Sequence, residues 1–170
     1  MRQLVSGDSD HVTDGDDEQL LRDLYPHLFR YAAVVGASWQ DPDDLVHDAL
    51  EATLRARSLT DIEHPLAYLR RSILSAAMRR QRRSGMFQRA AAVLVSADGE
   101  EPTYLSDLGD LEHLDPRDRG VLFLVHVEGL SHAEAGAELG ISETTCRQRA
   151  HRARLRLRSA IEAEEARHAR

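Results

Sequence analysis

The sequence of 170 residues contains no lysine and only one cysteine, Cys146. A single cysteine cannot form a disulfide within the chain, and it cannot by itself form a thiolate metal site. No stretch approaches the roughly 20 apolar residues that a membrane-spanning helix needs. The N-terminal run MRQLVSGDSD also lacks the apolar segment of a signal peptide. We therefore expect a cytoplasmic protein.

Aromatic residues are also scarce, at 5% of the chain. Strands recruit aromatic and β-branched side chains, whereas this composition is rich in alanine, leucine and arginine, which favour helices. We expect an all-α fold. A chain of this length forms one domain or two small ones and is too short for a large catalytic architecture.

The net charge of −7 argues at first against a nucleic-acid partner, because affinity for DNA comes largely from basic side chains that neutralise phosphates. The charge is nevertheless unevenly distributed, with −9 over residues 1–63, +7 over 64–97, −10 over 98–143 and +5 over 144–170. Every basic residue is arginine, the side chain best suited to bidentate phosphate and guanine contacts. An all-arginine set also fits the codon usage of a GC-rich genome.

The N-terminal part of the chain predicts three helices. Residues 1–16 lack hydrophobic periodicity, so we expect a disordered leader there. A helical pattern begins at Asp17, and Pro26 should kink it or split it. The second helix begins at Asp41 as N-cap.

The third predicted helix covers residues 65–83 and follows a loop at 58–64. Trp39, just before the second helix, is expected to pack between the first two helices. Residues 89–104 have the glycine, proline and acidic content of a flexible linker. We therefore expect two small helical domains, at 17–88 and 105–165.

Residues 131–157 have the spacing of a helix-turn-helix. Ser131 and Glu134 form a capping box, and Ser142 caps the last helix after a glycine turn. Helical periodicity of about 100° per residue predicts one buried face, formed by Cys146, Ala150, Ala153 and Leu157. The opposite face is polar and cationic, and consists of Thr144, Gln148, His151 and Arg152, flanked by Arg147 and Arg149. Such a face is suited to reading base edges in a major groove.

Two runs of the sequence resemble regions of bacterial sigma factors of the extracytoplasmic-function (ECF) group. The run LEHLDPRDRGVLFLVHVEGLSHAEAGAELGISETTCRQRAHRARLRLR is similar to region four. The run DPDDLVHDALEATLRA, followed by PLAYLRRSILSAAMRRQRR, is similar to region two. The resemblance implies a protein that binds RNA polymerase core, recognises two promoter elements and helps to open the DNA.

The same resemblance implies three sets of site residues. The minus-thirty-five element would be read by Thr144, Thr145, Arg147, Gln148, Arg149, His151, Arg152 and Arg154. The minus-ten strand would be held by Asp61, His64, Tyr68, Arg71, Ser75, Arg79 and Arg82. The polymerase clamp would be bound by Asp44, Leu45, Val46, His47, Asp48 and Leu50.

Four positions depart from the usual pattern of the family. His47 replaces a usual glutamine, Tyr68 a common tryptophan, and Ser75 and Arg79 a usual asparagine and aspartate. These departures bear on the sequence of the minus-ten element rather than on the fold. Tyr68 beside the arginine-rich helix still suits base stacking and backbone tracking of a single strand.

Other functions compete with this interpretation. The nine histidines form no paired ligand motif, and no nucleophile, base and oxyanion arrangement is apparent, so we expect no metal, no cofactor and no catalytic activity. Cys146 is expected to be a core residue, with a redox sensor as the alternative. A stand-alone helix-turn-helix regulator and a sigma-like module that captures an anti-sigma factor remain as alternatives. An anti-sigma factor is also expected as a partner of a true sigma factor.

The alternating charge blocks predict a masked free form. Acidic segments would lie against the arginine surfaces until polymerase separates the domains. Because pairs of exposed charges are weak and screened by salt, this masking should be relieved as ionic strength rises. Neutralising Asp98, Glu100 and Glu101 should have the same effect.

Overall fold

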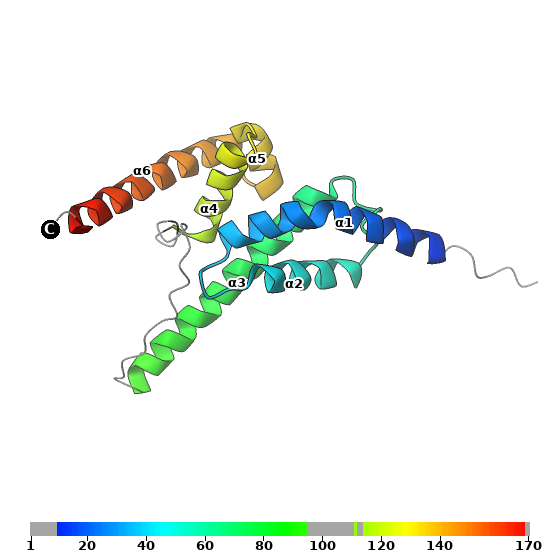
Figure 1. The fold of residues 1–170 in the computed structure, drawn as a ribbon, viewed down its shortest axis with the longest axis horizontal. Coiled ribbons are helices and arrows are strands. Elements are labelled where there is room, and N and C mark those ends of the chain that lie inside the picture. The colour runs from blue at the N-terminus through cyan, green and yellow to red at the C-terminus, as the bar shows by residue number, and fades with distance from the viewer. Residues whose placement is uncertain (1–9, 95–110, 112–113, 169–170) are drawn as a thin grey trace, which may run out of the picture.

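The computed structural model describes residues 10–94, 111 and 114–168, all in helices and connecting turns without a strand among them (Figure 1). The elements are α1 (Asp10–Val35), α2 (Pro42–Leu54), α3 (Pro65–Leu94), α4 (Pro116–Leu122), the π-helical turn η2 (Phe123–Val127), α5 (His132–Leu139) and α6 (Glu143–His168). The expected all-α fold is confirmed. None of the helices in the described ranges has the length and apolar character needed to cross a membrane.

Helix α1 differs from the prediction at two places. It begins at Asp10, inside the expected leader, and it continues through Pro26 as one helix. A proline in a helix leaves the carbonyl four residues earlier without its backbone donor. That carbonyl belongs to Arg22, and both Arg22 and Pro26 lie on the exposed face of α1. Water can therefore satisfy the carbonyl, and the helix is not interrupted.

The predicted start of α2 is confirmed, but the expected packing of Trp39 is wrong. The Asp41 side chain accepts a hydrogen bond of 2.9 Å from the Asp43 backbone N–H, as an N-cap should. Trp39 is 50% exposed. Its neighbour Gln40 is turned inward instead, and its side-chain amide donates to the carbonyl of Ala77 at 3.3 Å. Gln40, and not Trp39, is therefore the residue of this turn that packs inward, and it does so against α3.

The C-terminal helices begin and end at the predicted signals. Asp115 caps α4, and Ser131 and Glu134 form a reciprocal capping box at the start of α5. Helix α5 ends at Gly140, whose φ of +69° lies in the left-handed region that glycine adopts without strain. This glycine makes the tight turn between α5 and α6. Asp98, Glu100 and Glu101, at which the sequence predicts electrostatic masking, lie outside the described residues.

The two domains share one hydrophobic core. Helices α1, α2 and α3 form one unit, α4 and α5 pack against it through α1 and α3, and η2 and α6 pack on α4 and α5 (Figure 1). The buried cluster includes Leu28, Val35 and Ile73 from the first unit and Val121 and Leu124 from the second. A smaller cluster of Leu114, Leu122 and Ala153 closes the far side of α4.

Candidate nucleic-acid interface

Helix α6 presents the predicted polar face to solvent. Cys146, Ala150 and Ala153 are buried, as the periodicity predicted. Burial raises the pKa of the Cys146 thiol, which keeps it protonated and weakly nucleophilic. Exposed on the other side are Thr144, Arg147, Gln148, His151, Arg152 and Arg154. These side chains follow directly on the glycine turn, in the position of a recognition helix.

Four residues of the predicted minus-thirty-five set make contacts within the protein. Arg147 pairs with Glu143, and Arg152 donates to the Gln148 carbonyl at 3.4 Å, both within α6. Thr145 belongs to the start of α6, where its backbone N–H donates to the Ser142 hydroxyl at 3.2 Å. Arg149 lies on the side of α6 that faces α4, and its Nη1 is 2.6 Å from the Asp118 carboxylate. This ion pair ties Arg149 to α4, and its assignment to the minus-thirty-five element stays a prediction.

Asp118 is a residue whose role the sequence did not reveal. Its side chain is only 6% exposed and accepts from Arg149 and, at 3.3 Å, from Arg156. The local sequence gives no sign of this role, because a carboxylate in the first turn of a helix usually interacts only with the helix dipole. Its contacts are long-range, and they fix the reading helix against α4.

The predicted minus-ten residues lie along α3 and the preceding loop. Asp61, His64, Ser75, Arg79 and Arg82 are exposed. The Tyr68 ring is partly buried, with the Arg57 guanidinium 5.8 Å from its centroid. The Ser75 hydroxyl donates to the Arg71 carbonyl at 2.9 Å, which keeps this side chain close to the helix.

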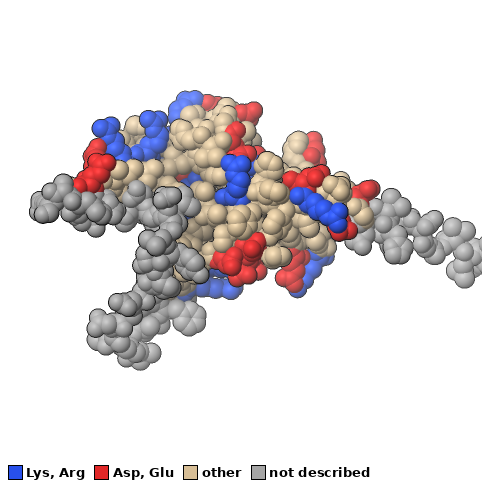
Figure 2. Space-filling model, in the orientation of Figure 1, with Lys and Arg blue, Asp and Glu red and all other residues tan. Residues whose placement is uncertain are grey.

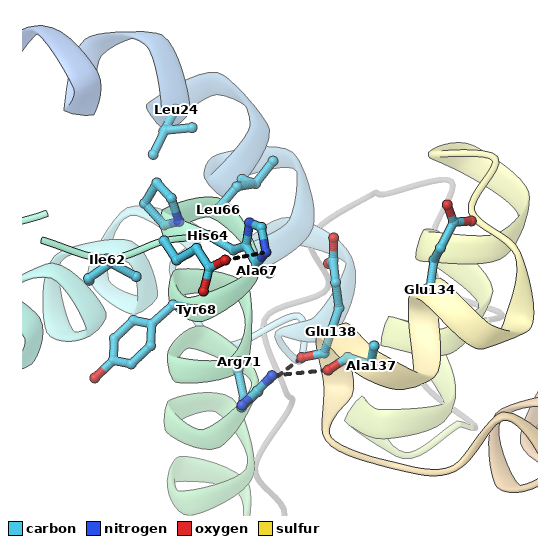
Figure 3. A pocket seen from close by; sticks show the side chains of 12 residues that line it. Leu24, Ile62, His64, Leu66, Ala67, Tyr68, Arg71, Glu134, Ala137 and Glu138 are labelled. Carbon is cyan, nitrogen blue, oxygen red and sulfur yellow. Dashed lines mark hydrogen bonds and ion pairs between the residues drawn. The ribbon is translucent and has the colours of Figure 1, made fainter. Parts of the chain in front are cut away.

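A cavity of about 720 Å³ lies beside these residues, at the junction of the two domains (Figure 3). Its walls include Leu24, Ile62 and Leu66 from the first domain and Glu134 and Ala137 from the second. His64, Tyr68 and Arg71 also line it. Arg71 spans the junction, because it donates to the carbonyls of Ala137 and Glu138 at 3.0 Å each.

The loop before α3 is fixed by a distant carboxylate, Asp17. Asp17 accepts hydrogen bonds from the Ser58 hydroxyl at 2.7 Å and from the backbone N–H groups of Leu59 and Thr60 at 3.1 and 2.9 Å. Partial burial acts to raise the pKa of Asp17, but these hydrogen bonds outweigh it and hold the pKa below its ordinary value. No sequence signal links residues this far apart in the chain.

Only half of the predicted polymerase-binding residues reach the surface of α2. Asp44, His47 and Asp48 are exposed. Leu45, Val46 and Leu50 are buried, because this face of α2 packs on α1 and α3. In the free chain these three side chains hold the helix in place, and their assignment to the polymerase clamp stays a prediction.

The exposed face of α2 is organised by hydrogen bonds and ion pairs. The Tyr25 hydroxyl donates to Asp43, which raises the pKa of Tyr25 to about 12. Arg80 of α3 lies 2.6 Å from Asp48 and 3.8 Å from Asp44. The acidic surface of α2 is thus partly neutralised by the neighbouring helix.

Charges of both signs are interspersed over the face of the molecule shown in Figure 2. The sequence blocks of opposite charge meet through ion pairs, of which Arg80 with Asp48, Arg70 with Glu128 and Arg149 with Asp118 are examples. Among the described residues, histidine, cysteine and carboxylate side chains form no cluster able to hold a metal ion.

Comparison with known proteins defines the class of this protein. Residues 20–86 match the family model of sigma-70 region 2, and residues 111–157 match that of sigma-70, region 4. The two matches cover most of the chain in the order that the sequence predicted. The chain therefore belongs to the sigma-70 family.

Within this family the protein is an ECF sigma factor. It directs transcription initiation, and its partners are RNA polymerase and promoter DNA. A search of curated proteins gave no significant match.

Two solved structures are similar over nearly the whole chain. The sigma factor RpoE in complex with the anti-sigma factor NepR, from Bartonella quintana, superposes with a TM-score of 0.62 at 24% identity, covering 86% of this chain and 97% of that one. CnrH in complex with the cytosolic domain of CnrY superposes with a TM-score of 0.58 at 26% identity, covering 92% and 99%.

Proposed function

We propose that the exposed turns of α6 read the minus-thirty-five element, and that α3 with its loop holds the melted minus-ten strand. The observation that carries the first half is the solvent-facing row of Thr144, Gln148 and His151 directly after the glycine turn. Glutamine and arginine offer bidentate hydrogen bonds to adenine and guanine, respectively. The second half is supported by Tyr68 and His64 beside a cavity, with a line of arginines along the same helix.

The exposed carboxylates of α2 are the surface that we assign to the polymerase clamp. Asp44 and Asp48 project from α2, with His47 between them. Such a surface favours a basic docking partner through charge complementarity. The chain acts, in this proposal, as a binding subunit without catalytic activity, in the cytoplasm where its polymerase partner works.

An anti-sigma factor is the second partner that we propose. One similar solved structure is a sigma factor in complex with an anti-sigma factor, and the other is CnrH in complex with the cytosolic domain of CnrY. A stand-alone helix-turn-helix regulator is less consistent with the chain, since the region 2 match covers residues outside any helix-turn-helix.

Reconstituted run-off transcription tests this function. The purified chain mixed with core polymerase should start transcription at a cognate promoter, and neither component alone should do so. The net charge disfavours tight autonomous binding to DNA. Nanomolar binding of the isolated chain to duplex promoter at physiological salt, without a requirement for core, would instead identify a stand-alone regulator.

A further inference from the structure

The seam between the two domains contains a buried cation, Arg70. Its side chain is 2% exposed, although it belongs to α3 of the first domain. Its Nη2 lies 2.8 Å from a carboxylate oxygen of Glu128, and its Nη1 lies 3.3 Å from one of Glu138, both in the second domain. A guanidinium withdrawn from water is costly unless it is paired, so these partners fix how the two domains meet.

A second contact at the seam depends on the absence of a side chain. Gly120 lies inside α4, where glycine is about 1 kcal/mol less favourable than alanine. A Cβ built on Gly120 would lie 2.8 Å from the Tyr31 hydroxyl oxygen of α1. The Tyr31 ring meets Phe123 edge-on at 5.5 Å and lies 5.8 Å from the Arg70 guanidinium carbon. The Tyr31 hydroxyl therefore packs directly against the α4 backbone at Gly120, where any side chain would collide with it.

Arg71 connects the seam with the predicted promoter contacts. Its two donors go to the last carbonyls of α5, at the negative end of that helix (Figure 3). The same side chain is assigned to the minus-ten strand. Docking occupies two of its five N–H groups, those on Nε and Nη2, so a strand that used the same N–H groups would compete with docking for Arg71.

We propose that Arg70, seated between Glu128 and Glu138 beside the Tyr31–Gly120 contact, is a latch that holds the free sigma factor in a docked state, in which Arg71 of α3 is engaged by α5 instead of by the minus-ten strand. The proposal rests on the proposed function for its consequence in transcription, but docking itself is a property of the free chain. In this proposal a buried interface between the domains, and not pairing of exposed charges, keeps the free protein compact. Because buried pairs are screened little by salt, docking should persist as ionic strength rises.

The test combines small-angle scattering on the free full-length chain with transcription at limiting sigma concentration. Glu128→Gln with Glu138→Gln removes both partner charges while preserving shape, and Gly120→Ala obstructs the seat of Tyr31. Both variants should keep their helical circular dichroism and have a larger radius of gyration. If about a tenth of the wild type is undocked, they should need about tenfold less sigma factor for half-maximal transcription.

A rescue variant distinguishes loss of the Arg70 ion pairs from a general loss of packing at the seam. Adding Arg70→Met to the double glutamine variant removes the stranded cation and leaves an uncharged seam, which should restore the compact radius. Glu162→Gln is the matched control, because it removes an exposed partner of Arg158 on α6, away from the seam, and should change neither readout.

Three results would overturn the latch. These are an unchanged radius in folded double and Gly120→Ala variants, failure of Arg70→Met to restore compaction, and a wild-type radius that grows steeply with salt. If the variants expand but no protein directs transcription with core polymerase, the latch stands and the proposed function fails. If transcription occurs and the radius does not respond, the function stands and the latch fails.

Discussion

The two domains expose their predicted nucleic-acid residues to different extents. On α6, Gln148 and His151 face solvent while the two domains are docked. On α3, Arg71 is hydrogen-bonded to α5 and its neighbour Arg70 is buried. A duplex-reading surface needs only a rigid helix, whereas a surface for a melted strand is needed only after polymerase has opened the DNA. Docking therefore engages one residue of the single-strand surface, Arg71, and leaves Gln148 and His151 of the duplex-reading face free of the first domain.

The largest expected effect on stability compares two ion pairs, Arg149 with Asp118 in the second domain and Arg80 with Asp48 in the first. Asp118→Ala leaves Arg149 without its buried partner and should lower the free energy of unfolding by about 3 kcal/mol. Asp48→Ala breaks the exposed pair with Arg80 and should cost at most about 1 kcal/mol. Thermal and chemical unfolding of the two variants measures both values. Equal losses would mean that burial does not distinguish the two pairs.

The reading face should respond next most strongly. Gln148→Ala or Arg147→Ala should cost about 1–3 kcal/mol in binding of the holoenzyme to its promoter, if each makes a bidentate base contact. Preference should relax at one or two positions of the minus-thirty-five element. Arg158→Ala, further along α6, is the control. A uniform loss on every promoter sequence would assign the two side chains to phosphates.

A smaller effect is expected at the loop that Asp17 holds. Asp17→Asn weakens the hydrogen bonds to residues 58–60 and should cost about 1 kcal/mol of stability, with a loss confined to minus-ten recognition. Since the folded pKa of Asp17 is lowered, its contribution is complete above the ordinary value of 3.8 and disappears as pH falls through the lower folded pKa. Unfolding of the wild type and variant from pH 7 to pH 2 should therefore converge at the acid end.

The smallest effect is expected at Cys146. Its buried thiol, with a raised pKa, should not react with a thiol reagent in the native protein and should react once the chain is unfolded. Mild oxidants should leave transcription unchanged. Rapid labelling of the native protein, accompanied by lost activity, would revive the redox-sensor hypothesis.

Local signals in the sequence predicted the helix starts and the buried stripe of α6. Asp41, Asp115 and the Ser131–Glu134 box act over a few residues, and Cys146 and Ala150 follow from helical periodicity alone. The start of α1 and the continuity at Pro26 were less accessible, because they depend on which face meets solvent.

The site was predictable where it depends on sequence spacing and was not where it depends on contacts between distant segments. The exposed row of α6 follows from periodicity. The pairing of Arg149 with Asp118 and the anchoring of residues 58–60 by Asp17 join residues far apart in the chain. The outward position of Trp39 likewise depends on Gln40 reaching across to α3.

Because α3 is long, a small rotation at the seam between the domains produces a large displacement at the far end of the helix. The helix extends from Pro65 to Leu94, about 45 Å at a rise of about 1.5 Å per residue, and the seam holds it in its second turn at Arg70 and Arg71. A tilt of the first domain by about 10° about the seam would move the Leu94 end of α3 by about 6 Å, given the same rise per residue. A rearrangement of a few side chains near Arg70 would thus be amplified into a displacement of several ångströms at the C-terminal end of α3, where the chain continues toward α4.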